Sequence, residues 1–309
     1  MRKAFALLVV LVLLAVGAGA AVAGGNVSGE ISEEIITFES DGGVVVGTMV
    51  MPGEVRGKVP AVLLLHGFTG TRDELPIFEP DWTFEETMYS RTARVFAENG
   101  IATLRIDFRG SGDSTDGFTF AETTFTTQVA DALAAVDFLD DQGRIGRIGV
   151  LGLSQGGLVG AVTAEAHKRV ESLVLWSPVT NPVDTYKLIL GEQNVLDGLN
   201  QATTHIVLPW TAIDLNQPFF IDLYHVDPIV AISDYDDPTQ VIVGSGDTLV
   251  TPQPMFGEVY MTHHEGVEEL VVVDGDHIFD ALAGNGAPAL DEAIGESLDW
   301  FQNTLGGRR

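Results

Sequence analysis

The stretch that decides the fold is Ile148-Gly-Val-Leu-Gly-Leu-Ser154-Gln-Gly-Gly157. Residues 148–153 form an apolar run without polar alternation, which is typical of a strand covered on both faces. Gly152 and Gly156 flank Ser154, and residues 155–167 read as a helix. A serine on a sharp turn between a strand and a helix has a strained backbone, and only glycines leave room around it. The pattern therefore predicts that Ser154 is a nucleophile.

Similar apolar runs recur on both sides of this turn and alternate with helical segments. The predicted strands are 34–39, 43–51, 60–65, 101–106, 148–153, 172–176, 240–243 and 270–273, and the predicted helices are 86–98, 124–140, 155–167, 254–263 and 280–304. The first two strands read as an antiparallel hairpin. Strand, helix and strand in repetition predict an α/β protein with a mostly parallel, doubly wound sheet.

One long stretch, residues 178–238, interrupts this rhythm between two core strands. It is rich in proline and aromatic residues, and ordinary connections between core strands are far shorter. A long surface connection between the two strands, without a role in binding, is one interpretation. We favour an inserted cap over the carboxyl ends of the strands, because ligands of open α/β sheets bind there and long loops tend to carry function.

The composition is strongly acidic, with 44 Asp and Glu against 16 Lys and Arg and a formal net charge of -28. A polyanion repels phosphate backbones and anionic lipid, so nucleic acid and membranes are not expected as partners beyond the export signal. The absence of cysteine excludes disulfides, thiolate zinc sites and cysteine nucleophiles. Few lysines and many acids resemble the solvent face of proteins from saline habitats, which predicts stability and activity that hold or rise in molar salt.

The N-terminus reads as an export signal. A short basic start, Met1-Arg-Lys3, precedes an apolar run and the small residues Ala21-Val-Ala23. This pattern predicts a signal peptide over residues 1–23, a mature domain over 24–309 and a secreted or periplasmic protein. An uncleaved membrane anchor is the alternative, since residues 4–23 could just span a bilayer.

Two further segments accompany the serine turn. Gly244-Ser-Gly-Asp247-Thr-Leu-Val250 follows one core strand, and Asp274-Gly-Asp-His277 follows the next. Together with the serine turn they resemble the serine α/β-hydrolase superfamily over nearly all of the mature chain. The resemblance implies the α/β-hydrolase fold and the chain order nucleophile, acid, histidine. It implies a catalytic triad of Ser154, Asp247 and His277.

The competing histidines and acids fit this order less well. The histidines that break the expected order or placement are His66, His167, His205, His225, His263 and His264. Asp274 and Asp276 are close to His277 in sequence, and such neighbours rarely have the side-chain geometry for a hydrogen bond to the imidazole. We therefore assign them to the turn.

The resemblance also implies an oxyanion hole. Leu65-His66-Gly-Phe68-Thr-Gly70 comes directly after a core strand, as the His-Gly-x loop of the family does. The backbone N–H groups of Phe68 and Gln155 are expected to face the tetrahedral oxyanion, and His66 is expected to brace the loop. The turn Asp107-Phe-Arg109-Gly-Ser-Gly112 is expected to be structural, with its charged side chains fixing loops by ion pairing.

Within the superfamily, the loop after His66, the Ser154-Gln-Gly-Gly157 turn and the long insert look like bacterial cinnamoyl (feruloyl) esterases. This resemblance implies a small-molecule ester as substrate, cleaved through an acyl-enzyme. The ester is expected to be aromatic, of the feruloyl or cinnamoyl type, or a short-chain carboxylic ester, the more general class. Trp210, Phe219 and Tyr224 of the insert are the candidate substrate-binding residues. No cofactor or metal is expected, and the oligomeric state is left open. The alternatives are a serine peptidase of the acylaminoacyl type and a non-catalytic binding protein on a hydrolase scaffold.

Overall fold

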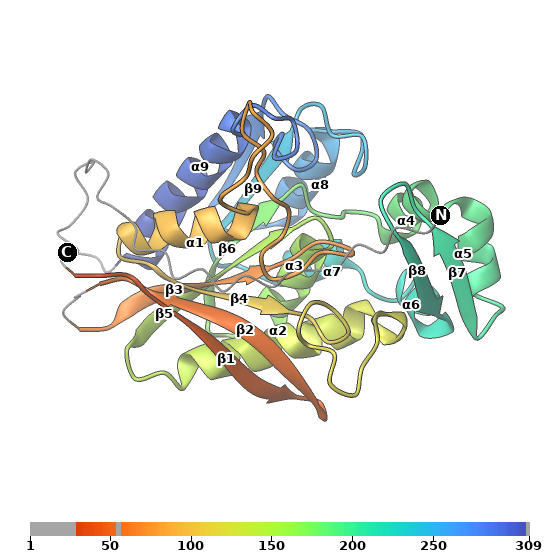
Figure 1. Cartoon of the computed structure of the whole chain (residues 1–309), viewed down its shortest axis with the longest axis horizontal. Coiled ribbons are helices and arrows are strands. Elements are labelled where there is room, and N and C mark those ends of the chain that lie inside the picture. The colour runs from red at the N-terminus through yellow and green to blue at the C-terminus, as the bar shows by residue number, and fades with distance from the viewer. Residues whose placement is uncertain (1–28, 54–56, 307–309) are drawn as a thin grey trace, which may run out of the picture.

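The computed structural model describes residues 29–53 and 57–306, and the predicted signal peptide lies outside them. The main sheet has eight strands in the order β1-β2-β4-β3-β5-β6-β9-β10 (Figure 1). These strands are β1 (Ser32–Ser40), β2 (Gly43–Met51), β3 (Val59–Leu65), β4 (Ala102–Asp107), β5 (Ile145–Leu153), β6 (Val170–Trp176), β9 (Thr239–Gly244) and β10 (Glu268–Val273). β1 and β2 pair antiparallel, as do β2 and β4, whereas the pairs from β4 to β10 are parallel. The predicted mostly parallel, doubly wound sheet is confirmed.

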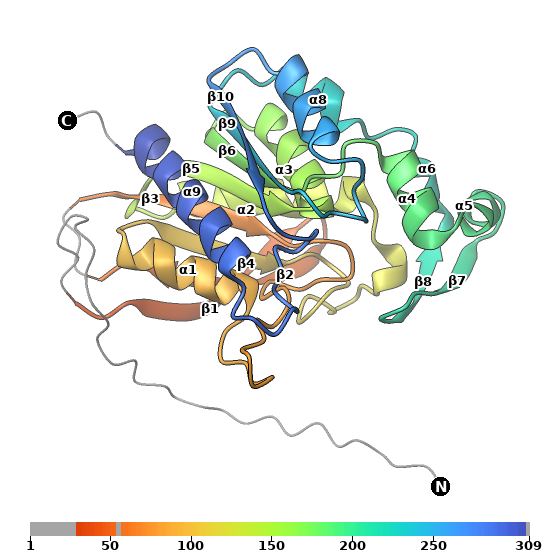
Figure 2. The same ribbon diagram turned by 90° about the horizontal axis from the view of Figure 1, so that it is seen from above.

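Helices cover both faces of this sheet (Figure 2). They are α1 (Met88–Glu98), α2 (Phe125–Asp140), α3 (Gln155–Ala166), α8 (Met255–His263) and α9 (Pro288–Leu305). Alternate residues of a strand point to opposite faces. Val62 and Leu64 of β3 accordingly pack in one cluster with α1 and α9, while Leu63 and Leu65 pack in another with α2 and α3. Both faces of the central strands are therefore buried, which explains why these strands read as unbroken apolar runs.

Local sequence sets where several of these helices begin. Threonines stand immediately before α1 and α2, and the hydroxyls of Thr87 and Thr124 accept hydrogen bonds from the N–H groups of Ser90 and Thr127. Such caps satisfy amide donors that the first helical turn leaves free.

The last helix differs from its prediction. The sequence pattern predicted a helix from residue 280, but α9 begins at Pro288. Phe279, Asp280, Gly284 and Gly286 all have positive φ angles, which an α-helix cannot contain. Proline at the first helical position then gives a fixed start. Residues 278–287 therefore form a loop that follows the predicted catalytic histidine.

The long stretch between β6 and β9 has secondary structure of its own. It contains α4 (Pro182–Leu190), α5 (Glu192–Gly198), β7 (Thr203–Val207), β8 (Ala212–Asn216), α6 (Gln217–Asp222) and α7 (Pro228–Ser233). β7 and β8 form a separate antiparallel hairpin, which lies with α4, α5 and α6 to one side of the main sheet (Figure 1). α7 contacts α3 and α8. We refer to residues 178–238 as the insert.

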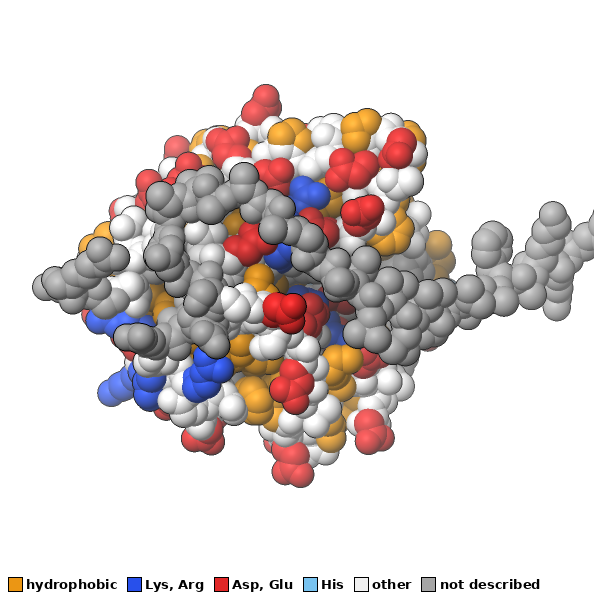
Figure 3. Space-filling model, turned by 60° about the vertical axis from the view of Figure 1, so that its left-hand side comes forward, with side chains coloured by type: hydrophobic (Ala, Val, Ile, Leu, Met, Phe, Trp, Pro, Cys, Tyr) orange, Lys and Arg blue, Asp and Glu red, His pale blue; other side chains and the backbone are white. Residues whose placement is uncertain are grey.

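Acidic side chains are scattered over the face of the molecule in Figure 3, with Lys and Arg in fewer places. Within residues 29–53 and 57–306, no helix combines the length and apolar character needed to cross a membrane.

Candidate active site

The turn between β5 and α3 holds Ser154 in the geometry that its sequence predicts. Its backbone has φ 56° and ψ -114°, a left-handed conformation that is strained for a serine. A Cβ on Gly152 would overlap the carbonyl oxygen of Gly156, and a Cβ on Gly156 would overlap that of Leu65. Both glycines are therefore required for the close packing of the turn.

The ends of neighbouring strands hold this turn in place. Ser154 N donates to Trp176 O at the end of β6 at 2.8 Å, and Ser154 O accepts from Val179 N at 3.1 Å. Because α3 starts at the next residue, the partial positive charge of its N-terminus lies beside the serine. The turn can thus present the serine as a nucleophile, and the N-terminus of α3 can stabilise negative charge that develops next to it.

Asp247 and His277 lie together at the same edge of the sheet, after the parallel neighbours β9 and β10. Asp247 Oδ2 is 2.7 Å from His277 Nδ1. The other carboxylate oxygen, Oδ1, accepts from the N–H groups of Leu249 and Val250 at 2.8 and 2.9 Å. Because two backbone N–H groups hold the carboxylate, it can fix the orientation of the imidazole. The bond at Nδ1 leaves Nε2 of His277 available for a further partner.

Ser154 and His277 are both largely buried, with 7% and 8% of their surfaces exposed. No hydrogen bond joins these two described residues in the structure. Such bonds are often long in the absence of substrate and tighten when substrate binds. The competing acids serve the turn instead, since Asp276 accepts from the N–H groups of Ile278 and Asp280, both at 2.9 Å.

The loop after β3 brings a backbone donor beside the serine. A Cβ built on Gly67 would lie 3.5 Å from Ser154 Cβ, so the two segments are in contact. Among the described residues, neither Phe68 N–H nor Gln155 N–H donates to a protein acceptor. Two free amide donors next to a serine are what an oxyanion hole requires.

His66 braces this loop, as expected from the sequence. Its Nε2 accepts from Phe108 N at 3.2 Å, so Nδ1 carries the proton and donates to Gly67 O at 2.8 Å. Burial lowers the pKa of the imidazole, which keeps it neutral in this role.

Glu74 is a second brace of the loop, and the sequence analysis missed it. Its carboxylate accepts from Gly67 N–H, next to the candidate donor Phe68. Burial raises the pKa of Glu74 to about 7, so this group titrates near neutral pH. A glutamate in a loop carries no sequence signal of such a contact.

The predicted structural turn after β4 is held by ion pairs. Asp107 pairs with Arg72, which also pairs with Asp113 at 2.6 Å. Arg109 pairs with Asp131 of α2 at 2.5 Å, and both side chains are almost fully buried. These contacts fix the loops around the site.

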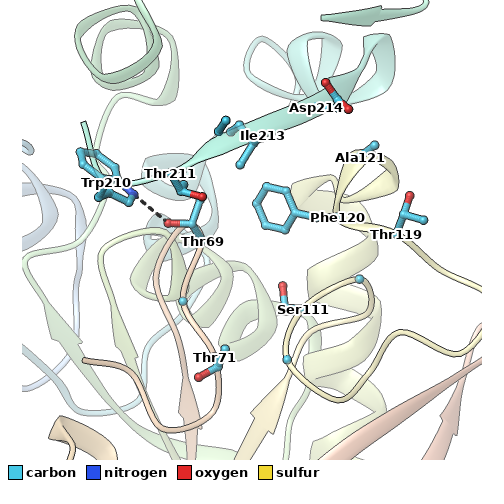
Figure 4. A pocket seen from close by; sticks show the side chains of 14 residues that line it. Thr69, Thr71, Ser111, Thr119, Phe120, Ala121, Trp210, Thr211, Ile213 and Asp214 are labelled. Carbon is cyan, nitrogen blue, oxygen red and sulfur yellow. Dashed lines mark hydrogen bonds between the residues drawn. The ribbon is translucent and has the colours of Figure 1, made fainter. Parts of the chain in front are cut away.

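A cleft of about 720 Å³ adjoins the loop after β3 (Figure 4). Its walls come from this loop, the turn after β4, the short helix η1 (Phe120–Glu122) and β8. Hydroxyl side chains are frequent in it: Thr69, Thr71, Ser111, Thr119 and Thr211. Such walls can hydrogen-bond a polar part of a ligand.

The three candidate substrate-binding residues lie in different surroundings. Trp210 lines the cleft, and its Nε1 donates to Thr69 Oγ1 at 3.1 Å (Figure 4). Phe219 is fully buried and stacks beneath Phe68 with ring centroids 5.8 Å apart. Tyr224 is half exposed, and of the described residues that line the cleft only Trp210 belongs to the predicted set. α6 turns its Phe219 side into the core, which the sequence alone could not show.

The chain is similar in sequence to known proteins. Residues 85–233 match the family model described as serine aminopeptidase, S33, a segment that includes Ser154 but neither Asp247 nor His277. Esterase EstD of Thermotoga maritima is 27% identical over 261 residues, covering 77% of this chain. The chain spans 60% of the length of that relative.

Solved structures show the same fold. Est1E from Butyrivibrio proteoclasticus with bound ferulic acid has a TM-score of 0.71 at 20% identity, covering 87% of this chain and 99% of Est1E. The Pyrococcus furiosus esterase Pf2001 has a TM-score of 0.62 at 20% identity, covering 89% of this chain and 94% of the esterase. The chain has the α/β-hydrolase fold, and the predicted resemblance to this superfamily is confirmed.

Proposed function

We propose that the protein is a secreted serine hydrolase that cleaves small carboxylic esters through an acyl-enzyme. The observation that carries the proposal is the bond between Asp247 and His277 at the sheet edge where the strained turn presents Ser154. The free N–H groups of Phe68 and Gln155 add an oxyanion hole beside it. Esterase EstD and the Pyrococcus furiosus esterase Pf2001 are both named as esterases, which favours esters over other acyl compounds.

In this mechanism His277 Nε2 takes the proton of Ser154 as the hydroxyl attacks the ester carbonyl. The oxyanion forms between Phe68 N–H and Gln155 N–H, and each donor lowers the barrier by about 3–4 kcal/mol. Asp247 holds the Nδ1–H tautomer and stabilises the imidazolium. The imidazolium then protonates the leaving alcohol, and water attacks the acyl-enzyme with His277 again as base.

For the substrate we propose esters with a short or aromatic acyl group. Est1E, which shares the fold, was solved with ferulic acid bound. The cleft beside the loop after β3 combines the aromatic side chains of Phe120 and Trp210 with several hydroxyl groups, so it offers both apolar and polar contacts. A series of p-nitrophenyl esters from C2 to C12, run beside methyl ferulate, measures this preference. A peak kcat/KM on long acyl chains would contradict it.

Ser154→Ala tests the reaction itself. We expect the variant to lose ester turnover and keep its circular dichroism spectrum. Parental activity in Ser154→Ala would contradict the nucleophile assignment. No activity in the wild-type protein on any ester of the series would favour the binding-protein alternative.

Export is part of the proposal and rests on the N-terminal sequence alone. N-terminal sequencing of the protein recovered from the medium or periplasm of an expression host should start at Gly24. A protein that keeps Met1 and sediments with membranes would support the anchor instead.

A peptidase is the second candidate, favoured by the match of residues 85–233 to the serine aminopeptidase model. Amino-acid p-nitroanilides and the matching p-nitrophenyl esters separate the two reactions. We expect turnover of the esters only, and a higher kcat/KM on the anilides would reverse the assignment.

A further inference from the structure

A line of buried hydrogen bonds runs from the insert to α2 directly behind Gln155. The hydroxyl of Tyr186 on α4 donates to Gln155 Oε1, and Gln155 Nε2 donates to Gln128 Oε1 on α2 at 2.6 Å. Gln128 Nε2 continues the line to Thr123 Oγ1 at 3.1 Å. Tyr186 is 0% exposed, and Gln155 and Gln128 are 1% and 2% exposed. Water cannot replace a partner here, so each bond fixes the group that makes it.

The same tyrosine contacts the other side of the oxyanion hole. The ring of Tyr186 meets the ring of Phe68 edge to face, with centroids 5.2 Å apart and an angle of 89°. Its hydroxyl and its ring thus reach the two residues whose N–H groups are the candidate donors. One side chain of the insert therefore contacts both residues.

Donor position decides how well an oxyanion is stabilised, because an error of about 1 Å in such a site can cost 10²-fold in rate. Gln155 is the first residue of α3, and its side-chain bonds tie the backbone segment that carries the N–H after the nucleophile to α2 and α4. Without the Tyr186 hydroxyl, Gln155 Oε1 would stay buried without its donor, and the side chain would have to turn.

We propose that Tyr186 is a positioning residue of the reaction, which holds Gln155 through its hydroxyl and Phe68 through its ring. The inference rests on the proposed serine-hydrolase function and deepens it. The insert then contributes to kcat, in addition to any contact it makes with substrate.

The test is Tyr186→Phe, which keeps the ring on Phe68 and removes only the hydroxyl. Tyr235→Phe is the matched control, since Tyr235 is also buried and its hydroxyl donates to Val170 O at the start of β6, away from the site. Two rates are measured for each protein: the reaction of Ser154 with a fluorophosphonate, which places a phosphoryl oxygen in the oxyanion hole, and the turnover of p-nitrophenyl acetate.

Loss of a whole donor costs about 10²–10³-fold in kcat, so a displaced donor should cost part of this. We expect Tyr186→Phe to lower the fluorophosphonate rate and kcat by roughly tenfold or more with KM nearly unchanged. Tyr235→Phe should change neither rate. Equal losses in both variants would reduce the role of Tyr186 to general stability and overturn the inference.

A second variant distinguishes a specific role of the Tyr186 hydroxyl from general damage to the fold. Gln155→Met removes the acceptor, so adding Tyr186→Phe to it should have little further effect if the hydroxyl acts through Gln155. Independent, multiplying losses would contradict the inference. A wild-type protein that reacts, with Tyr186→Phe reacting equally fast, overturns the inference alone. A wild-type protein that does not react with the fluorophosphonate overturns the proposed function and the inference with it.

Discussion

Replacing Glu74 by glutamine should change how stability depends on pH. Burial raises the pKa of Glu74 from 4.5 to about 7 in the native protein. The native state therefore holds a proton that the unfolded chain has released, so the wild-type protein loses stability as pH rises from 4.5 to 7. The full shift corresponds to about 3 kcal/mol, and because pH 5 already lies above 4.5, about 2–3 kcal/mol of it is lost between pH 5 and pH 8.5. Glutamine keeps an acceptor for Gly67 N–H and has no proton to lose.

Urea unfolding at pH 5 and at pH 8.5 measures this effect. Relative to wild type, Glu74→Gln should gain about 2–3 kcal/mol of unfolding free energy between the two pH values. Glu292→Gln on the exposed side of α9 removes the same charge and controls for general repulsion in an acidic protein. A pH-independent difference between Glu74→Gln and wild type, or an equal gain in Glu292→Gln, would refute the reasoning.

Three other perturbations should change stability or activity. Arg109→Met should cost about 3–5 kcal/mol in unfolding free energy, because it leaves the buried Asp131 carboxylate without its cation; a loss under 1 kcal/mol in urea unfolding would contradict this. Asp247→Asn should lower kcat on p-nitrophenyl acetate by about 10⁴-fold, since asparagine holds the wrong imidazole tautomer, whereas near-parental kcat would assign the acid elsewhere. Melting temperature and kcat should hold or rise from 0.1 to about 2 M NaCl as salt screens the net charge of -28, and a steep loss of either would reject salt adaptation.

The sequence predicted the central architecture because its signals are local. An apolar run followed by Gly152-Leu-Ser154-Gln-Gly156 specifies a strand, a strained turn and a helix whatever the rest of the chain does. The resemblance to the serine α/β-hydrolases then led to Asp247 and His277, whose side chains lie within hydrogen-bond distance of each other. The strand, turn and helix around Ser154 can be read within a few residues.

Contacts between distant segments could not be predicted in this way. Glu74 reaches Gly67 only because its loop folds back, and Tyr186 reaches Gln155, 31 positions earlier in the sequence, only because the fold brings the two residues together. Phe219 was a candidate substrate-binding residue from the sequence, yet the direction of α6 buries it against Phe68. The prediction that the last helix begins at residue 280 was wrong. Several residues before Pro288 have positive φ angles, and hydrophobicity carries no sign of such angles.

The central claim, that Ser154 is the nucleophile of an ester hydrolase, is tested most directly by p-nitrophenyl acetate turnover in three proteins. They are the wild type, Ser154→Ala and Ser177→Ala, the last a buried serine that also has positive φ and whose hydroxyl has no partner among the described residues. We predict that kcat/KM falls by at least about 10⁴-fold in Ser154→Ala and stays near parental in Ser177→Ala. Turnover by a correctly folded Ser154→Ala at the wild-type rate would contradict the account.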